Sequence, residues 1–390
     1  MRMLSVHMMV RDGAATVERA LLPLKGIADE VVLLDTGSTD GTVEKVWELC
    51  KVLGMGIRTK LVTPASDPEL FIKDVPGSWK RSIPGYFTGR SILRDRGAMR
   101  NVGCDLCMGD YILKLDADDE PMSPENILPT LDYLDSRPDI EILSCPNEMI
   151  DGRGEIEYAC MDDRIWRNEG AIRWTEPIHE RLSPKTRRNH LLTARGLVFR
   201  HWNAPSGDGV RVDHEDYKMA LAGHERILQS QVSSTSVIIH DFTPAMLYDL
   251  GREAVEVDPS FARKVLIDAA LSGFGFEGSE QEWMVHLQMG RSHEFEGNMG
   301  LAIFDYMKAQ KASVMLPESY LYLGFAQRKI EDPLWKESLL KAVILTKKKS
   351  VFNVPLKMLK EAEHLVYDEL KILEGSVDSF IPEKSMRKVP

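Results

Sequence analysis

The chain has 390 residues, of which 43% are apolar and 28% are charged, with 20 prolines and 28 glycines. This is ordinary globular composition, which excludes disordered and collagen-like chains, and at about 150 residues per domain the length predicts two or three domains. The net charge of −11 opposes binding to polyanions, so nucleic acids and anionic membranes are not favoured as partners.

The cysteines indicate a reducing compartment, because five of them form an odd and sparse set. Cys104 and Cys107 form a CxxC pair, but no second pair or nearby histidine completes a zinc set, so we expect buried thiols. The apolar run at the N-terminus is too short for a signal peptide, and no stretch of 18 apolar residues occurs. We therefore expect a cytoplasmic protein without a membrane span.

The first 60 residues alternate apolar runs with amphipathic segments. We expect strands at Met3–Val10, Glu30–Leu34 and Ile57–Val62, and helices at Ala15–Leu24 and Thr42–Leu53. Strands that alternate with helices predict a parallel α/β sheet.

Residues 63–93 break this pattern, because four prolines and three glycines interrupt any period. We expect a loop or insertion of about 30 residues here, which is either a functional lid or a disordered excursion. Trp79, Tyr86 and Phe87 favour the lid.

The sheet then continues into a second half with a more antiparallel character. The expected elements are a helix at Arg94–Met108, a strand at Tyr111–Leu115, a helix at Pro124–Ser136, and strands at Glu141–Pro146, Ile156–Cys160 and Arg164–Arg167.

From about Asp213 the pattern is amphipathic helix, with a repeat marked by Gly251, Gly290 and Gly324. Their spacing is close to the 34-residue period of tetratricopeptide units, in which small residues lie where two helices pack. We predict a degenerate array of about three units, closed by a cap around Val354–Ile372.

Two places carry chemistry, and the first is VVLLDTGSTDGT, which puts Asp35 at the end of a strand. Ligands of open α/β sheets bind outside the carboxyl ends of strands, where a carboxylate can accept from a ribose hydroxyl or a base. A structural turn that begins the next helix is the alternative.

The second place is LDADDE, where Asp116, Ala117 and Asp118 end a strand. Two carboxylates on one side of a turn are hard oxygen donors suited to Mg²⁺ or Mn²⁺ bridging a diphosphate. The acidic run Asp118–Glu120 could also be a plain surface loop.

These sites, in this order, resemble the family 2 glycosyltransferases of the GT-A fold over about residues 1–203. The matching segments are MMVRDGAATVERAL, DEVVLLDTGSTDGT, RGAMRN, YILKLDADDE, RIWRNEGAIRWTEPIHERL and LVFRHW. The resemblance implies an α/β GT-A nucleotide-sugar-binding domain with a mixed, mainly parallel sheet over residues 1–210. An all-α tetratricopeptide-like domain over residues 211–390 would follow it.

The resemblance also implies a set of residues that bind the sugar-nucleotide donor. By position, these are Val10, Arg11, Asp35, Arg100, Asp116 and Ala117. Val10 and Arg11 would line the base pocket and Asp35 would hold uracil or ribose. Arg100 would approach the diphosphate, and Asp116 would contact the ribose.

The metal and the general base follow from the same resemblance. Asp118 would hold Mn²⁺ or Mg²⁺, and His201 is a candidate further ligand or phosphate contact, with a structural histidine at a strand end as the alternative. Glu180 is the favoured base for the acceptor proton, and Asp162 and Asp163 are its rivals.

The resemblance predicts an inverting transfer of a sugar from a nucleotide diphosphate, such as a UDP-hexose, to a peptide, protein or other nucleophile. The helical domain would bind the acceptor or form a homodimer. One rival is a sugar nucleotidyltransferase, which usually needs a glycine-rich phosphate loop where RDGAAT has one glycine. The other is a helical-repeat binding protein with a degenerate transferase domain.

Overall fold

The computed structural model describes most of the chain, in a series of segments. These are residues 2–73, 91–93, 95–152, 154–175, 180–183, 190–191, 196–202, 244–275, 279, 281–347 and 356–367. Contacts between residues divide the chain into two units, Met1–Phe274 and Gly275–Pro390.

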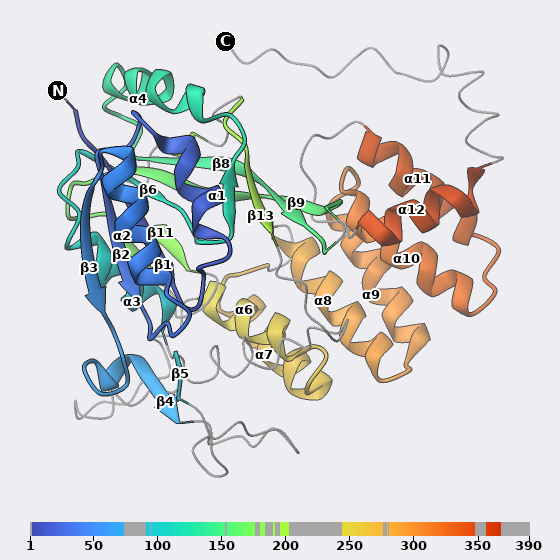
Figure 1. The fold of residues 1–390 in the computed structure, drawn as a ribbon. Helices are drawn as coiled ribbons and strands as arrows, with labels where there is room; N and C mark the ends of the chain where they lie inside the picture. Colours follow the sequence, from blue (N-terminus) through green and yellow to red (C-terminus); the bar gives the residue numbers. More distant parts are fainter. Residues whose placement is uncertain are drawn as a thin grey trace. The chain divides into compact units, whose positions relative to one another are not determined.

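A mixed sheet forms the centre of the first unit, with strands in the order β3-β2-β1-β6-β9-β8-β13-β7 and β12 beside β8 (Figure 1). The bounds are β1 Leu4–Val10, β2 Glu30–Asp35, β3 Gly56–Leu61, β6 Tyr111–Lys114, β7 Asp119–Pro121, β8 Ile142–Ile150, β9 Ile156–Arg167, β12 His190–Leu191 and β13 Phe199–Trp202. Strands β1, β2, β3 and β6 are parallel, and β8, β12 and β13 are parallel to one another. Only β9 and β7 run antiparallel to their neighbours. The predicted mixed, mainly parallel sheet is confirmed.

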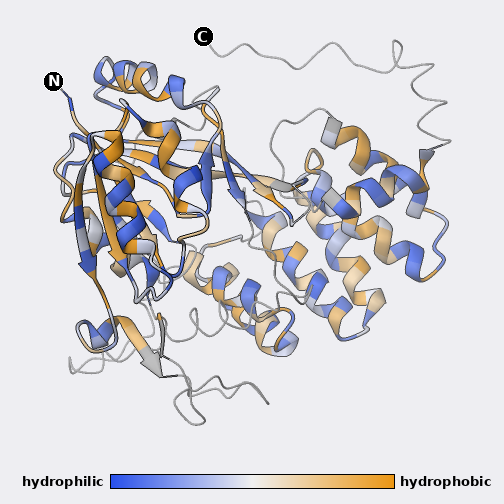
Figure 2. Ribbon diagram, in the orientation of Figure 1, coloured by the Kyte–Doolittle hydropathy of each residue, from blue (hydrophilic) through white to orange (hydrophobic). Residues whose placement is uncertain are grey.

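Helices cover both faces of this sheet, because the strands alternate apolar side chains between two cores. Val31 and Leu33 of β2 join the core cluster that contains residues of α1 (Val17–Leu21), α2 (Thr42–Leu53) and α4 (Ile127–Asp135). Val32 and Leu34 point the other way, toward Cys104 and Met99 of α3 (Arg96–Cys104). Figure 2 shows how the hydrophobic strands lie between helices of mixed character.

The helices that cover this sheet confirm most of the predicted elements. They are α1 Val17–Leu21, α2 Thr42–Leu53, α3 Arg96–Cys104 and α4 Ile127–Asp135, with the 3₁₀ turns η1 Leu22–Leu24, η2 Pro68–Leu70 and η3 Pro124–Asn126. Helix α2 ends at Gly54, whose φ of 75° lies in the left-handed region that closes a helix. Helix α3 is shorter than predicted, because the chain turns after Cys104 toward β6.

The structure differs from the predicted strands in three places. Residues 156–167 form one strand where two were expected, since β9 pairs along most of its length with β8. Within the expected loop 63–93, β4 Phe71–Lys73 pairs antiparallel with β5 Ser91–Leu93. Phe71 and Leu93 pack against the core beside α3, which holds both ends of the insertion. Trp79, Tyr86 and Phe87 lie outside the described residues.

A further short pair joins β10 Arg173–Thr175 to β11 Arg181–Ser183.

The second half of the chain is helical where it is described, as predicted. The helices are α6 Pro244–Ala254, α7 Pro259–Leu271, α8 Glu282–Phe295, α9 Met299–Ala312, α10 Pro317–Lys329, α11 Trp335–Lys347 and α12 Leu356–Leu365. The pair α6–α7 falls in the first unit and the other helices in the second. A domain boundary at residue 210 stays a prediction, because residues 203–243 lie outside the described part.

The repeat glycines lie at close helix contacts. A Cβ on Gly290 would come within 2.4 Å of Tyr306, and one on Gly324 within 2.5 Å of Leu339. Glycine at these positions lets α8 approach α9 and lets α10 approach α11, which is the packing that the repeat predicted.

Two further sequence expectations concern the thiols and the membrane. Cys104 and Cys107 are buried and free, as predicted. Among the described helices, none combines the length and the hydropathy needed to cross a bilayer.

Candidate functional site

The site residues meet at one edge of the sheet because of strand direction. Strands β1, β2, β6 and β13 all end at this edge, since β9 reverses direction once between β6 and β8. The turn after β6 carries Asp116 and Asp118, and His201 lies near the end of β13. Residues far apart in the chain are therefore neighbours here.

A candidate metal group lies where β7 pairs with β13. One ligand atom from each of Asp118, Asp119 and His201 lies within 4.8 Å of the others. Nδ1 of His201 is 3.5 Å from Oδ1 of Asp118 and 3.0 Å from Oδ1 of Asp119. The side chain of Asp118 is 37% exposed, so it is open to a ligand from solvent. The structure therefore brings together the two residues predicted for the metal.

The protonation of this group follows from its surroundings. Burial raises the pKa of Asp118 to about 6, and the charges of Asp116 and Asp119 add to the rise. Burial opposes the charged forms of Asp119 and His201 too, but the Arg164 charge lowers the pKa of Asp119 and the Asp119 hydrogen bond raises the pKa of His201. A dense set of carboxylates of this kind favours a bound cation.

Arg100 joins two other predicted site residues. Its Nε donates to Oε1 of Glu180 at 2.6 Å, and its terminal nitrogens donate to the two Asp116 oxygens at 3.2 and 3.4 Å. Arg100 is 4% exposed, and all three of its nitrogens are engaged. The guanidinium therefore fixes Asp116 and Glu180 and does not project freely toward a diphosphate.

This ion pair changes the chemistry open to Glu180. Burial would raise its pKa, but the charges of Arg100, Arg96 and Lys114 and the hydrogen bond from Arg100 together outweigh burial and lower the pKa of Glu180 to about 2. A carboxylate so strongly held in its ionised form is a weak proton acceptor near neutral pH. The contacts favour a positioning role for Glu180, and its role as the base stays a prediction.

Asp162 lies in a second chain of charges along β9. It accepts from Nζ of Lys114 at 2.7 Å and pairs with Nε of Arg164 at 3.0 Å. Arg164 also forms an ion pair with Asp119, so Asp162 is linked to the metal group. Asp163 instead accepts from the hydroxyl of Ser144 and is not joined to this network by a described contact.

Asp35 is buried at the end of β2, and its side chain stabilises the turn that follows it. Its carboxylate accepts from the backbone amides of Gly37 and Ser38, the shortest at 3.0 Å. These bonds form the turn of the structural alternative, but Asp35 does not cap α2, which follows Gly41. A carboxylate has about four acceptor positions, so a nucleotide contact remains compatible with these bonds.

The other predicted donor residues have different surroundings. Val10 is buried in the core. Arg11 is exposed, and its Nε lies 3.9 Å from Oδ2 of Asp12. Ala117 packs close to Gly13, where an added Cβ would lie 2.9 Å from it. These contacts connect the turns after β1 and β6, but they show no base pocket.

Sequence reasoning missed Lys114, Arg164 and the central place of Asp119. One signal was available, because Lys114 interrupts the apolar run YILKL and a lysine in a buried strand needs a partner. Arg164 gave no such signal, since its contact with Asp119 depends on how β9 pairs with β6.

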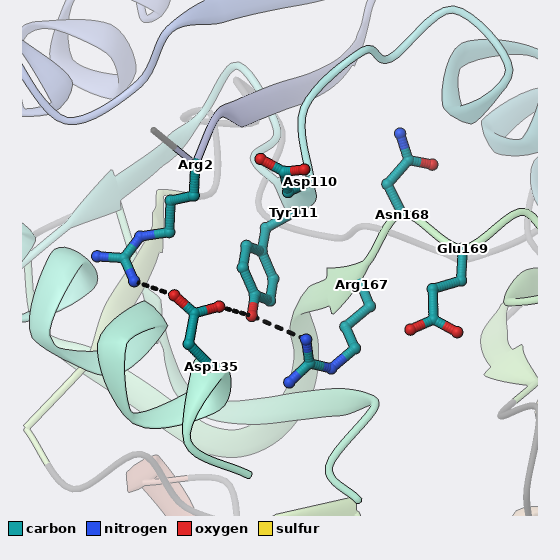
Figure 3. Close-up of a pocket in the computed structure, with 7 residues that line it drawn as sticks. All are labelled: Arg2, Asp110, Tyr111, Asp135, Arg167, Asn168 and Glu169. Atoms are coloured by element: carbon teal, nitrogen blue, oxygen red, sulfur yellow. Dashed lines mark hydrogen bonds and ion pairs between the residues drawn. The ribbon is translucent and has the colours of Figure 1, made fainter. Parts of the chain in front are cut away.

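A pocket of about 530 Å³ lies at the opposite edge of the sheet (Figure 3). Its polar groups bind one another: Tyr111 donates to Asp135 at 2.7 Å and accepts from Arg167 at 2.9 Å, and Arg2 pairs with Asp135 at 2.7 Å. These groups stabilise the start of β6 and the end of β9, and we assign the pocket no ligand.

Comparison with known proteins gives distant similarities. No protein-family model matches the chain. A TPR repeat-containing protein of Synechococcus elongatus is 29% identical over 180 residues, which are 46% of this chain and 35% of that protein. The chain thus spans about a third of the length of this curated relative.

Among solved structures, the chain is similar to TarS of S. aureus, with 12% identity, a TM-score of 0.36, and coverage of 82% of this chain and 55% of TarS. It is also similar to glucosyl-3-phosphoglycerate synthase from Mycobacterium tuberculosis, solved with Mn²⁺ and UDP-glucose. That likeness has 18% identity and a TM-score of 0.26, and it covers 44% of this chain and 57% of the synthase.

Proposed function

We propose that this chain is a metal-dependent glycosyltransferase that takes its sugar from a nucleotide diphosphate. The observation that carries the proposal is the group of Asp118, Asp119 and His201 at the carboxyl edge of a mixed sheet. Asp35 ends β2 and Asp116 follows β6, and these two parallel strands flank β1 and end at the same edge. The order of motifs along the chain, which resembles the family 2 glycosyltransferases, supports the same reaction.

The residues of the metal group fit Mn²⁺ or Mg²⁺. Carboxylate oxygens with one imidazole nitrogen form a suitable donor set for these ions. Asp118 and His201 would hold the ion, which when bound supplies positive charge for the leaving diphosphate.

The remaining residues would orient the donor and exclude water. Arg100 holds the carboxylate of Asp116 in place by two donor contacts, and Asp116 would accept from a ribose hydroxyl. Asp35, fixed by the amides of its own turn, would accept from the base. We take UDP as the nucleotide and a hexose as the sugar.

For the proton of the acceptor we propose Asp162. Lys114 and Arg164 pair with Asp162 as Arg100 pairs with Glu180, so exposure is what separates the two carboxylates. The side chain of Asp162 is 24% exposed, against 10% for Glu180, and an acceptor can reach it more readily. Inversion needs one base and no covalent carboxylate. Asp163, bound to Ser144, and Glu180, paired with Arg100, are the rivals that mutation must separate.

A peptide or protein is the acceptor that the helical repeats favour. Stacked helix pairs of this type offer an extended surface for a polypeptide. The same helices could instead join two copies of the chain, and sizing of the full chain in solution separates these two roles.

Release of UDP from a panel of UDP-sugars, with Mn²⁺ and with EDTA, tests the proposal. We expect metal-dependent release from at least one UDP-hexose. UDP binding without release would favour the helical-repeat binding protein, and formation of UDP-sugar from UTP and a sugar phosphate would favour the nucleotidyltransferase.

A further inference from the structure

We infer that Asp119 is a positioning residue that fixes the ring of His201, and that it is not itself a metal ligand. The inference rests on the proposed metal role of Asp118 and His201. It assigns different roles to two adjacent carboxylates of the same acidic run.

The surroundings of the two carboxylates differ. Asp119 is fully buried, and Asp118 keeps 37% of its side chain exposed. Beyond its own backbone, the Asp118 carboxylate has a described side-chain contact with His201, at 3.5 Å, which is longer than a good hydrogen bond. Asp118 is therefore the carboxylate that an incoming ion can reach.

Both oxygens of Asp119 are already engaged. Oδ2 accepts from the backbone amide of Asp116 at 2.8 Å and forms the ion pair with Arg164. Oδ1 lies 3.0 Å from Nδ1 of His201. A metal on Oδ1 would have to share that oxygen with Nδ1 of His201, and a metal on Oδ2 would meet both the Asp116 amide and the positive charge of Arg164.

The contact with Asp119 also sets the tautomer of His201. A carboxylate that is ion-paired with arginine is ionised and only accepts hydrogen bonds. Nδ1 of His201 therefore carries the hydrogen and donates it to Asp119, which leaves the lone pair on Nε2. Second carboxylates commonly hold a metal-binding histidine in this way, and their loss typically costs about 10-fold to 100-fold in metal affinity.

The metal-free wild-type chain allows a first test by ¹⁵N NMR of its histidines. We expect the His201 resonances, assigned with His201→Gln and followed to a pH at which the ring is neutral, to show hydrogen on Nδ1 and a lone pair on Nε2. On titration with Mg²⁺ the Nε2 resonance should move more than the Nδ1 resonance. A hydrogen on Nε2 would overturn the inference, because Nδ1 and Asp119 would then be free to bind the ion together.

Calorimetric titration with Mn²⁺ alone gives the second test. Asp119→Asn should weaken Mn²⁺ binding by about 10-fold to 100-fold and should change the tautomer signal of His201. Glu148→Gln is the matched control, because Glu148 pairs with Arg200, the neighbour of His201, at 2.8 Å. This control should bind Mn²⁺ as the wild type does.

The outcomes separate the inference from the proposed function. Wild-type affinity in folded Asp119→Asn would overturn the positioning role and leave the metal site intact. A wild-type chain that binds no Mn²⁺ would overturn the metal role on which both rest. If thermal unfolding shows that Asp119→Asn does not fold, the NMR result on the wild type decides alone.

Discussion

The Nε atom of Arg100 donates to Oε1 of Glu180 at 2.6 Å, and the same guanidinium binds both oxygens of Asp116. Arg100 thus links the end of β6 to the segment before β11. The side chains of Arg100 and Glu180 are almost fully enclosed, and that of Asp116 is 25% exposed. The buried charge of Arg100 therefore depends on both carboxylates, and that of Glu180 depends on Arg100.

This relationship predicts the effect of Glu180→Gln. The amide cannot balance the charge of Arg100, so we expect lower thermal stability and weaker UDP binding in the presence of Mn²⁺. Turnover at saturating donor should fall by less than about tenfold, because a general base typically contributes 100-fold or more. Calorimetry with UDP and steady-state kinetics measure the two effects.

Asp162→Asn provides the contrasting variant. We expect it to bind UDP nearly as well as the wild type and to lose about 100-fold or more in turnover. The base would be Glu180 if Asp162→Asn turns over normally and Glu180→Gln binds UDP normally but is inactive. If Asp163→Asn alone is dead, the base is Asp163.

His7 predicts acid sensitivity of the fold. Burial lowers the pKa of His7 to about 3, and neither ring nitrogen has a hydrogen-bond partner in the described structure. Since the unfolded chain binds the proton near pH 6.5 and the folded chain does not, stability falls as the pH drops below about 6.5.

The variant His7→Leu removes this titration. It should be more stable than the wild type at pH 5, and its advantage should grow by up to about 1.4 kcal/mol for each pH unit below 6.5. Urea unfolding at several pH values checks this. Equal pH dependence in the two chains would show that His7 titrates normally.

The helix contacts predict opposite effects for two glycines of α8 and α9. Gly290→Ala would place a Cβ 2.4 Å from Tyr306, so we expect a loss of about 1–3 kcal/mol in stability from overpacking. Gly300 is the matched control, since an added Cβ there meets nothing within 4 Å. Gly300→Ala should be neutral or up to about 1 kcal/mol more stable, because alanine favours helix. Similar unfolding curves for the two variants would refute the close packing.

The ion pair between Arg181 and Asp249, at 3.1 Å, predicts where the chain can be shortened. Asp249 belongs to α6 and is buried, so removing α6 takes away a partner of the residue next to Glu180. A fragment of residues 1–274 should bind UDP with Mn²⁺ like the full chain. A fragment of residues 1–210 should bind more weakly, and equal UDP affinity in the two fragments by calorimetry would contradict this dependence.

The fold could be predicted well from the sequence, because local patterns determine most of its elements. Helix α2 matches its predicted bounds, since its hydrophobic period ends at Gly54, and Asp35 ends β2 next to the predicted turn. The short strands β4 and β5 could not be predicted, because their pairing depends on contacts with the core around α3.

The candidate site could be predicted only in part. Asp118 and His201 were identified by their motifs, and the structure brings them together. The contacts of Arg100 with Glu180 and of Arg164 with Asp119 join residues 80 and 45 positions apart. No local pattern encodes such pairs, and they decide which carboxylates are held by cations and which are open.

The central claim is that Asp118 holds a divalent ion for a nucleotide diphosphate. The most direct measurement is a calorimetric titration of UDP into the wild type and Asp118→Asn, each with Mn²⁺ and with EDTA. We predict that Mn²⁺ strengthens UDP binding to the wild type by at least about tenfold and that Asp118→Asn loses this gain. Thermal unfolding of Asp118→Asn must show that the variant is folded. UDP binding of equal strength with Mn²⁺ and with EDTA, or an undiminished gain in Asp118→Asn, would contradict the account.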